Sequence, residues 1–117
     1  MKKTYTGGCH CGKVRFEVQA DIAEVITCNC SRCRKVGALL SAVPMSDFKL
    51  LSGADELTDY QFNKRRIHHP FCRTCGIESY AYGKGPGGED MVMLNVRCLD
   101  DVEPEQFKVR KFDGAKL

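Results

Sequence analysis

Three short groups contain seven of the eight cysteines in this 117-residue sequence, and they constrain the fold more than any other feature. The groups are Cys9-x-Cys11, Cys28-x-Cys30-x-x-Cys33 and Cys72-x-x-Cys75-Gly76. A gap of two residues lets two sulfurs face one ion, and a glycine directly afterwards tolerates the backbone conformation that such a turn needs. In a C-x-C pair, the alternation of an extended chain would point both sulfurs to the same side. The spacing therefore predicts metal binding by cysteine thiolates.

The rest of the sequence favours a reducing compartment for these thiols. The opening stretch, MKKTYTGGCH, contains two lysines but no apolar segment behind them, so we expect no signal peptide. No apolar run approaches the roughly 20 residues that a membrane helix requires. We therefore expect a cytoplasmic protein with mostly reduced cysteines and no membrane partner. In that compartment, clustered cysteines indicate a metal before a disulfide.

Seven ligands divide most simply into four and three. Zinc takes four ligands in a structural site, and three plus an open position in a catalytic one. Cys28, Cys30 and Cys33 are close enough in sequence to bind one ion unaided. The other four cysteines would then close a second site across residues 12–71; they are Cys9, Cys11, Cys72 and Cys75. Two alternatives stay open, namely disulfides and a zinc ribbon that pairs Cys30/Cys33 with Cys72/Cys75 and leaves the other three cysteines without partners.

The charge of the chain does not indicate a nucleic-acid partner. The formal net charge of +3 counts the thiols as neutral. Seven thiolates holding two Zn²⁺ ions would bring that charge to zero. The basic run NKRRIHH at 63–69 is more typical of a solvated strand face, because acidic residues are spread through the rest of the chain. We expect no nucleic acid to bind.

Hydrophobic periodicity predicts one domain over residues 1–117, built of short strands. The segment 13–19, KVRFEVQ, alternates cleanly, with Val14, Phe16 and Val18 on one face. Further strands are predicted at 24–28, 38–43, 48–53, 57–63, 66–71, 78–83, 91–99 and 107–112. Helical turns are predicted only at 31–37 and 101–107, and GKGPGGED at 83–90 is typical of a hairpin loop. The fold class is therefore all-β.

The remaining cysteine and the histidines are weaker candidates for metal binding. Cys98 falls within the predicted strand 91–99 and is more typical of a core thiol than of an eighth ligand. His10 stands between two candidate ligands and should point away from their metal. His68 and His69 precede the third cysteine group on alternate faces. One of them could approach the site, but a surface or hydrogen-bonded histidine is the better interpretation.

The motifs together resemble those of the glutathione-dependent formaldehyde-activating (Gfa) enzyme family. The resemblance rests on GCHCGKVRF at 8–16, CNCSRCR at 28–34, FCRTCG at 71–76 and NVRCLDD at 95–101, so it covers nearly the whole chain. It implies a β-tent fold of short antiparallel sheets around a structural zinc. This fold is shared with the Mss-four-like Rab-exchange factors and with centromere protein V. Asn29 stands where a histidine is frequent in the family.

The resemblance also implies a role for each cysteine group. A structural zinc would be held by Cys9, Cys11, Cys72 and Cys75. A second, catalytic zinc would be held by Cys28, Cys30 and Cys33 at the glutathione site. The family's reaction joins the glutathione thiolate to formaldehyde to give S-(hydroxymethyl)glutathione, which places it in the carbon–sulfur lyase class. The expected partners are thus a small thiol and a small aldehyde, and the oligomeric state is left open.

Chemistry favours a thiol substrate at such a second site. Three thiolates around Zn²⁺ leave a net charge of −1, and this soft centre suits a fourth sulfur better than activation of water. Arg32, Arg34 and Lys35 could offset that charge or meet a glutathione carboxylate, or they could be ordinary surface charges. A zinc deaminase is disfavoured, because its P-C-x-x-C motif is interrupted here by Phe71. The alternatives to an enzyme are a glutathione-binding carrier without catalysis and a zinc-stabilised interaction module.

Overall fold

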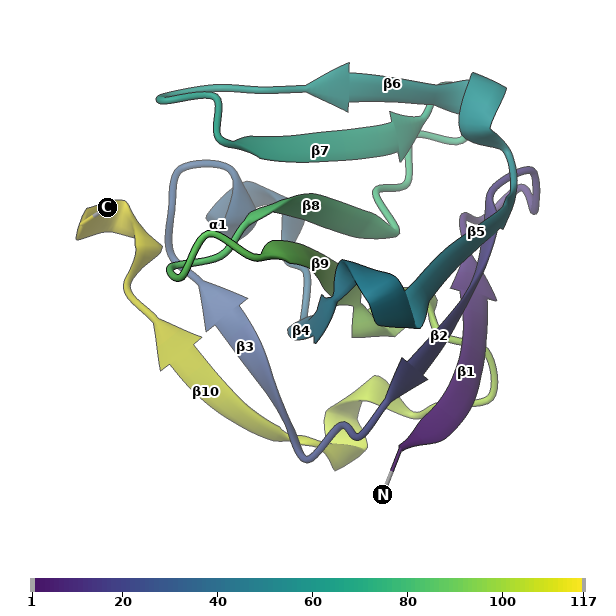
Figure 1. Cartoon of the computed structure of the whole chain (residues 1–117), viewed down its shortest axis with the longest axis horizontal. Helices are drawn as coiled ribbons and strands as arrows, with labels where there is room; N and C mark the ends of the chain where they lie inside the picture. The colour runs from purple at the N-terminus through teal and green to yellow at the C-terminus, as the bar shows by residue number, and fades with distance from the viewer. Residues whose placement is uncertain (1, 117) are drawn as a thin grey trace.

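A computed structural model of the chain describes residues 2–116 and arranges its strands in two sheets (Figure 1). The smaller sheet is antiparallel, with the order β1 (Lys3–Gly8), β2 (Arg15–Ala20) and β5 (Phe48–Ser52). β2 overlaps the alternating segment predicted at 13–19 and ends one residue beyond it. Phe16 and Val18 of this strand are fully buried, whereas Glu17 between them is half-buried. The predicted alternation thus decides which face of β2 meets the core.

The larger sheet has seven strands whose order departs from their order in the sequence. From one edge to the other they are β10 (Lys108–Phe112), β3 (Glu24–Cys28), β4 (Leu40–Pro44), β9 (Asp90–Asn95), β8 (Tyr80–Lys84), β7 (Ile67–Cys72) and β6 (Leu57–Tyr60). Neighbouring strands are antiparallel except β3 and β10, which run parallel. The resemblance implied antiparallel sheets, and the parallel pairing of β10 with β3 is the one exception among the described strands. A parallel pair requires a long crossover, and the chain between β3 and β10 provides it.

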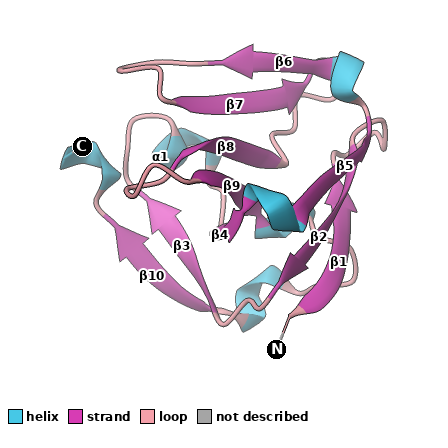
Figure 2. Ribbon diagram, in the orientation of Figure 1, coloured by secondary structure: helices cyan, strands magenta, loops and turns pink. Residues whose placement is uncertain are grey.

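Helices are short throughout residues 2–116 (Figure 2). The helix α1 (Cys33–Val36) has four residues, and 3-10 turns cover Met45–Asp47, Ala54–Glu56, Val96–Cys98, Pro104–Gln106 and Gly114–Lys116. Both helical turns predicted from the sequence are among them. A helix of the length and apolarity needed to span a membrane is not found in this part of the chain. The prediction of an all-β, β-tent fold is confirmed.

Two strands end several residues earlier than the sequence predicts, and β5 ends one residue earlier, at Ser52. The predicted strand 91–99 stops at Asn95, whose side chain accepts a hydrogen bond of 3.2 Å from the backbone N–H of Arg97. That bond caps a 3-10 turn, so Cys98 lies in the turn and not in a strand. β6 likewise ends at Tyr60. In both places a local turn replaces the end of the predicted strand.

The core lies between the two sheets and continues towards one cysteine group. Phe48 contacts the rings of Phe16 and Tyr80, with centroids 5.3 and 4.7 Å apart. A second buried cluster includes Cys9 and Cys72, and the side chains of Leu50 and Leu57 pack against both clusters. In the view of Figure 1, the hairpin between β1 and β2 lies at the right, while the carboxyl end of β3 and the C-terminus lie at the left. Apolar packing therefore supports the first cysteine group, at the β1–β2 hairpin.

Two candidate metal centres

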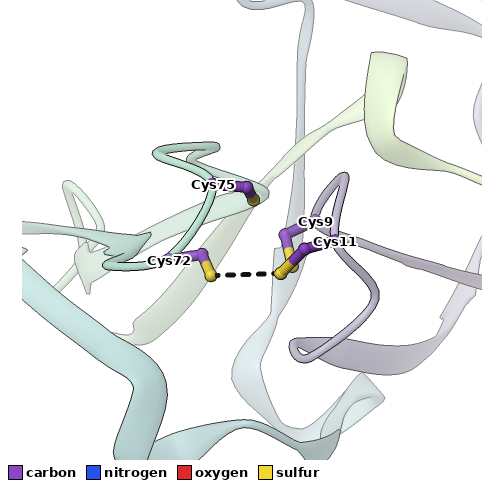
Figure 3. A group of neighbouring side chains, drawn as sticks. All are labelled: Cys9, Cys11, Cys72 and Cys75. Atoms are coloured by element: carbon purple, nitrogen blue, oxygen red, sulfur yellow. Dashed lines mark hydrogen bonds between the residues drawn. The ribbon is translucent and has the colours of Figure 1, made fainter.

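Four cysteines from distant segments converge on one point (Figure 3). Their sulfurs all lie within 4.8 Å of one another; the residues are Cys9, Cys11, Cys72 and Cys75. The Sγ atoms of Cys9 and Cys11 are 3.6 Å apart, and so are those of Cys11 and Cys72. A tetrahedral zinc with Zn–S bonds of about 2.3 Å has S···S edges of about 3.8 Å. The donor set and its spacing thus fit a zinc ion.

A tight turn between β1 and β2 presents the first two sulfurs. The backbone N–H of Gly12 donates to the carbonyl of Cys9 at 3.3 Å, and the N–H of Val14 donates to Cys9 Sγ at 3.3 Å. The sequence argument assumed an extended C-x-C segment, and that local conformation is wrong. The turn still brings both sulfurs together. His10, at its tip, is exposed and does not join the four sulfurs, in agreement with the prediction that it points away from their metal.

The other two sulfurs come from the turn that follows β7. Gly76 has φ of +80°, a conformation that favours glycine, and its N–H donates to the carbonyl of Cys72 at 2.7 Å. Burial raises the pKa of Cys75, but hydrogen bonds from the backbone N–H groups of Cys11 and Ile77 outweigh it and lower the pKa to about 6. A hydrogen bond from the backbone N–H of Cys75, together with a weaker one from that of Thr74, also lowers the pKa of Cys72. This turn therefore favours the thiolate form that a metal requires.

The second group is the local trio at the carboxyl end of β3. Cys28 is the last residue of β3, Cys30 lies in the following turn, and Cys33 is the first residue of α1. Their sulfurs lie within 4.8 Å of one another, and no fourth His, Cys, Asp or Glu within residues 2–116 joins them. The N–H of Cys30 donates to Cys28 Sγ at 3.5 Å, and the N–H of Cys33 donates to Cys30 Sγ at 3.3 Å. The trio therefore offers three sulfur donors where a structural zinc would need four.

The trio is half-buried, and burial acts on its thiols. It raises the pKa of Cys28 and, with the neighbouring Cys30 thiol, that of Cys33. At Cys30, burial is also the largest single influence, but hydrogen bonds from the backbone and thiol of Cys33, the backbone of Arg32 and the thiol of Cys28 together outweigh it and lower the pKa. Without a cation, these sulfurs would thus not all be ionised near neutral pH. A positively charged ligand would offset the energetic cost of ionising all three half-buried thiols.

The grouping agrees with the division into four and three rather than with its alternatives. Cys30 and Cys33 belong to one group and Cys72 and Cys75 to the other. The structure therefore does not place these two pairs around one ion, as a zinc ribbon would. All eight cysteines are free thiols, so the described part of the chain contains no disulfide. The binding of zinc by either group stays a prediction.

The three cations next to the trio differ in their surroundings. Arg32 donates from Nη2 to Glu78 Oε1 at 2.8 Å, and its guanidinium lies 4.7 Å from the ring centre of Tyr60. Arg34 and Lys35 are exposed and have no ion-pair partner among the described residues. The structure thus places all three cations beside the cysteines, but it gives Arg32 an internal partner. Their contact with a substrate stays a prediction.

The C-terminal segment covers the trio, which the sequence did not indicate. Asn29 donates from Nδ2 to Asp113 Oδ1 at 2.9 Å, and its Oδ1 accepts from the backbone N–H of Ala115 at 2.9 Å. A Cβ atom added to Gly114 would collide with Cys28 Sγ. Strands at 24–28 and 107–112 were both predicted. Nothing in their sequences indicated that they pair.

The remaining candidates lie outside both groups. Cys98 is half-buried in its 3-10 turn, and burial raises its pKa to about 11, so it stays a thiol. His68 stacks on Tyr82 at 4.5 Å and contacts Asp59 Oδ2 at 2.6 Å. His69 is buried, with Nδ1 3.5 Å from a carboxylate oxygen of Glu78. Within residues 2–116 no histidine joins either cysteine group.

Comparison with known proteins shows similarity over most of the chain. The sequence model of the glutathione-dependent formaldehyde-activating enzyme family matches residues 4–112. A crystal structure of a protein from Rhodobacter sphaeroides is 35% identical in sequence and superimposes with a TM-score of 0.79. This likeness covers 90% of the present chain and 99% of the other.

Proposed function

This chain belongs to the glutathione-dependent formaldehyde-activating enzyme family, and from that premise we propose that it is a zinc-dependent carbon–sulfur lyase. Its proposed activity joins the sulfur of glutathione to the carbon of formaldehyde, giving S-(hydroxymethyl)glutathione. The observation that carries the proposal is the trio of half-buried sulfurs of Cys28, Cys30 and Cys33. This trio has one donor fewer than a closed zinc site and adjoins a pocket of about 480 Å³ that includes Cys28.

Each cysteine group has its own role in this proposal. Cys9, Cys11, Cys72 and Cys75 would hold a structural zinc. Cys28, Cys30 and Cys33 would hold a second zinc, which when bound would keep a substrate thiol as the nucleophilic thiolate near neutral pH. The all-sulfur donor sets and their short S···S spacing support both assignments.

The residues around the trio would position the reactants and compensate charge. As the C–S bond forms, the π pair of the formaldehyde carbonyl moves to oxygen, and that oxygen takes up a proton in place of the one that glutathione sulfur lost. Three thiolates carry more negative charge than one Zn²⁺ neutralises, so the free cations Arg34 and Lys35 would stabilise the site. Arg32, paired with Glu78, would act as a positioning residue for the Cys30–Cys33 loop.

Metal analysis and calorimetry test the proposal. Protein prepared without chelator should contain two zinc ions per chain. Glutathione should bind at least about tenfold more tightly than S-methylglutathione, because methylation converts the ionisable thiol to a thioether. Equal affinity for the two compounds would contradict binding through sulfur. One zinc per chain under zinc-replete conditions would contradict the division into four and three.

A rate measurement separates an enzyme from a carrier. Thiols add to formaldehyde without a catalyst, so formation of the adduct alone decides nothing. Exchange NMR of glutathione and formaldehyde should show faster interconversion when catalytic amounts of the protein are present. Tight binding of glutathione with an unchanged rate would identify a carrier, and two zinc ions without any thiol binding would favour an interaction module.

A further inference from the structure

A pocket opens beside Cys28 between two segments that are far apart in sequence. Its volume is about 480 Å³, and its walls include Cys28, Asn29, Arg34, Lys111, Phe112 and Asp113. One wall is the turn after β3 together with α1, and the other is the end of β10. The walls of this pocket therefore include one cysteine of the trio and two cationic residues.

The pairing of β10 with β3 builds the second wall. In the parallel register, Lys111 stands opposite Thr27 and Phe112 opposite Cys28. Beyond the last pair, the backbone N–H of Asn29 donates to the carbonyl of Phe112 at 3.3 Å. The side chain of Asn29 then holds the next turn through Asp113. The backbone of Lys111 is thus held near the cysteine trio by its pairing with β3 and, two residues further on, by the hydrogen bond from Asn29 to Asp113.

Two cationic residues of the pocket have no carboxylate partner among the described residues. Arg34 and Lys111 are exposed, and neither has an ion-pair partner among the residues that the structure describes. The carboxylate of Asp113 lines the same pocket, but it accepts a hydrogen bond from Asn29 and lies 3.4 Å from the ammonium group of Lys116. Asp113 therefore already has partners, whereas the two cationic residues that line the pocket have no carboxylate partner among the described residues.

A second pocket, lined by other residues in and beside α1, has fewer cationic residues without a carboxylate partner. Its volume is about 370 Å³, and its walls include the rings of Tyr60 and Phe62 and the aliphatic side chain of Val36. Its arginine, Arg32, is neutralised by Glu78 at 2.8 Å, which leaves Lys35 as its free cation. An anion should prefer the first pocket, where a planar guanidinium and an ammonium group are both available.

We propose that Arg34 and Lys111 bind a carboxylate of the thiol substrate in the pocket beside Cys28, and that they thereby select anionic thiols over neutral ones. Lys111 is then a specificity-determining residue contributed by the last strand, and Asn29 positions it. The inference rests on the thiol binding at Cys28, Cys30 and Cys33 proposed above, but it concerns the other end of the ligand.

Calorimetry of the zinc-loaded full chain with three ligands separates the contribution of the ligand's thiol from that of its carboxylates. Glutathione presents both a thiol and carboxylates, its diethyl ester keeps the thiol but lacks the carboxylates, and S-methylglutathione keeps the carboxylates alone. We expect the ester to bind about tenfold more weakly than glutathione. In Lys111→Gln and Arg34→Gln this difference should shrink several-fold, because the partner of the carboxylate is gone.

Lys108→Gln is the matched control, because Lys108 is an exposed lysine on the same strand but outside the pocket. It changes the net charge equally and should leave the preference for glutathione over its ester intact. Equal affinity of the ester and glutathione for the unmodified protein would overturn the inference. So would an equal loss of preference in Lys108→Gln and Lys111→Gln, or no binding of glutathione at all. If S-methylglutathione binds as tightly as glutathione while the ester binds weakly, the proposed function fails and the carboxylate site stands.

Discussion

At the scale of single residues, the cysteine trio depends on two neighbours that are not metal ligands. Asn29 holds Asp113 and Ala115 with the two ends of its amide, and so fixes the last turn of the described chain. Gly114 brings the backbone of that turn against Cys28 Sγ, where a side chain has no room. The amide and the glycine together decide how closely the C-terminal segment covers the trio.

Gly114→Ala should weaken metal binding at the trio without unfolding the protein. The new methyl group would collide with Cys28 Sγ and lie 3.4 Å from the Cβ of Cys30, so the turn and the sulfur could not both keep their places. Residues that orient a ligand typically contribute about 10–100-fold to metal affinity. We expect a loss of about tenfold for one of two zinc ions, measured by competition with a colorimetric chelator.

Gly87→Ala is the control for this substitution. Its Cβ would meet only the carboxylate end of the flexible Glu89 side chain, in the loop between β8 and β9. Both zinc affinities should be unchanged there. An unchanged affinity in Gly114→Ala as well would mean that the C-terminal turn moves aside, and that it does not constrain Cys28.

At the scale of elements, the four-cysteine group is a junction between the two sheets. Cys9 and Cys11 belong to the turn after β1, and Cys72 and Cys75 to the end of β7 and the turn after it. Cys9 and Cys72 are buried with Val14 in a small cluster of their own. The trio, by contrast, joins only β3 to α1. Loss of the four-cysteine group should therefore destabilise the fold far more than loss of the trio.

Cys75→Ser should give insoluble or molten protein, whereas Cys30→Ser should stay folded. A structural zinc contributes about 10–16 kcal/mol at neutral pH, and a domain of this size has a net stability of about 5–15 kcal/mol. A metal that joins distant segments also constrains the unfolded chain most. Thermal unfolding beside metal analysis checks this, with one zinc and no glutathione binding expected for Cys30→Ser. A folded Cys75→Ser together with an unfolded Cys30→Ser would reverse the two roles.

Local patterns explain which of these elements the sequence could predict. The alternation around Phe16 gave β2, and the spacing of the cysteines gave both groups, because each depends on residues only a few positions apart. β1 was not predicted, since its residues KTYTGG combine polar side chains with two glycines. The contact of Gly114 with Cys28 could not be found either. It depends on the pairing of β10 with β3, which is a property of the whole sheet.

At the scale of the whole molecule, one ion pair connects the surroundings of the two cysteine groups. Arg32 lies within the loop of the trio, and Glu78 follows the turn that carries Cys75. The Glu78 side chain is only 10% exposed, and it accepts from Arg32 Nη2 at 2.8 Å and from Arg32 Nε at 3.3 Å. His69 lies 3.5 Å from the same carboxylate. Burial raises the pKa of Glu78, but hydrogen bonds from His69 and Arg32 outweigh it and lower the pKa.

Glu78→Gln should therefore destabilise the protein in a manner that depends on pH. Hydrogen bonds to charged groups contribute about 1.5–3 kcal/mol, and we expect a loss in that range at pH 7, measured by urea unfolding. Because the folded pKa is below the unfolded value of about 4.3, the stabilisation is fully present above that value. It is lost as the pH falls through the folded pKa, so the difference between the two proteins should narrow below about pH 4.3. Effects of acid on the cysteines are common to both proteins and cancel in the difference. Glu24→Gln, which breaks the exposed pair with Arg110, should cost only about 0–1 kcal/mol at any pH. Glu78→Gln could instead lower the free energy of unfolding by an equally small amount, or by an amount that grows in acid. Either result would mean that this ion pair does not connect the surroundings of the two cysteine groups.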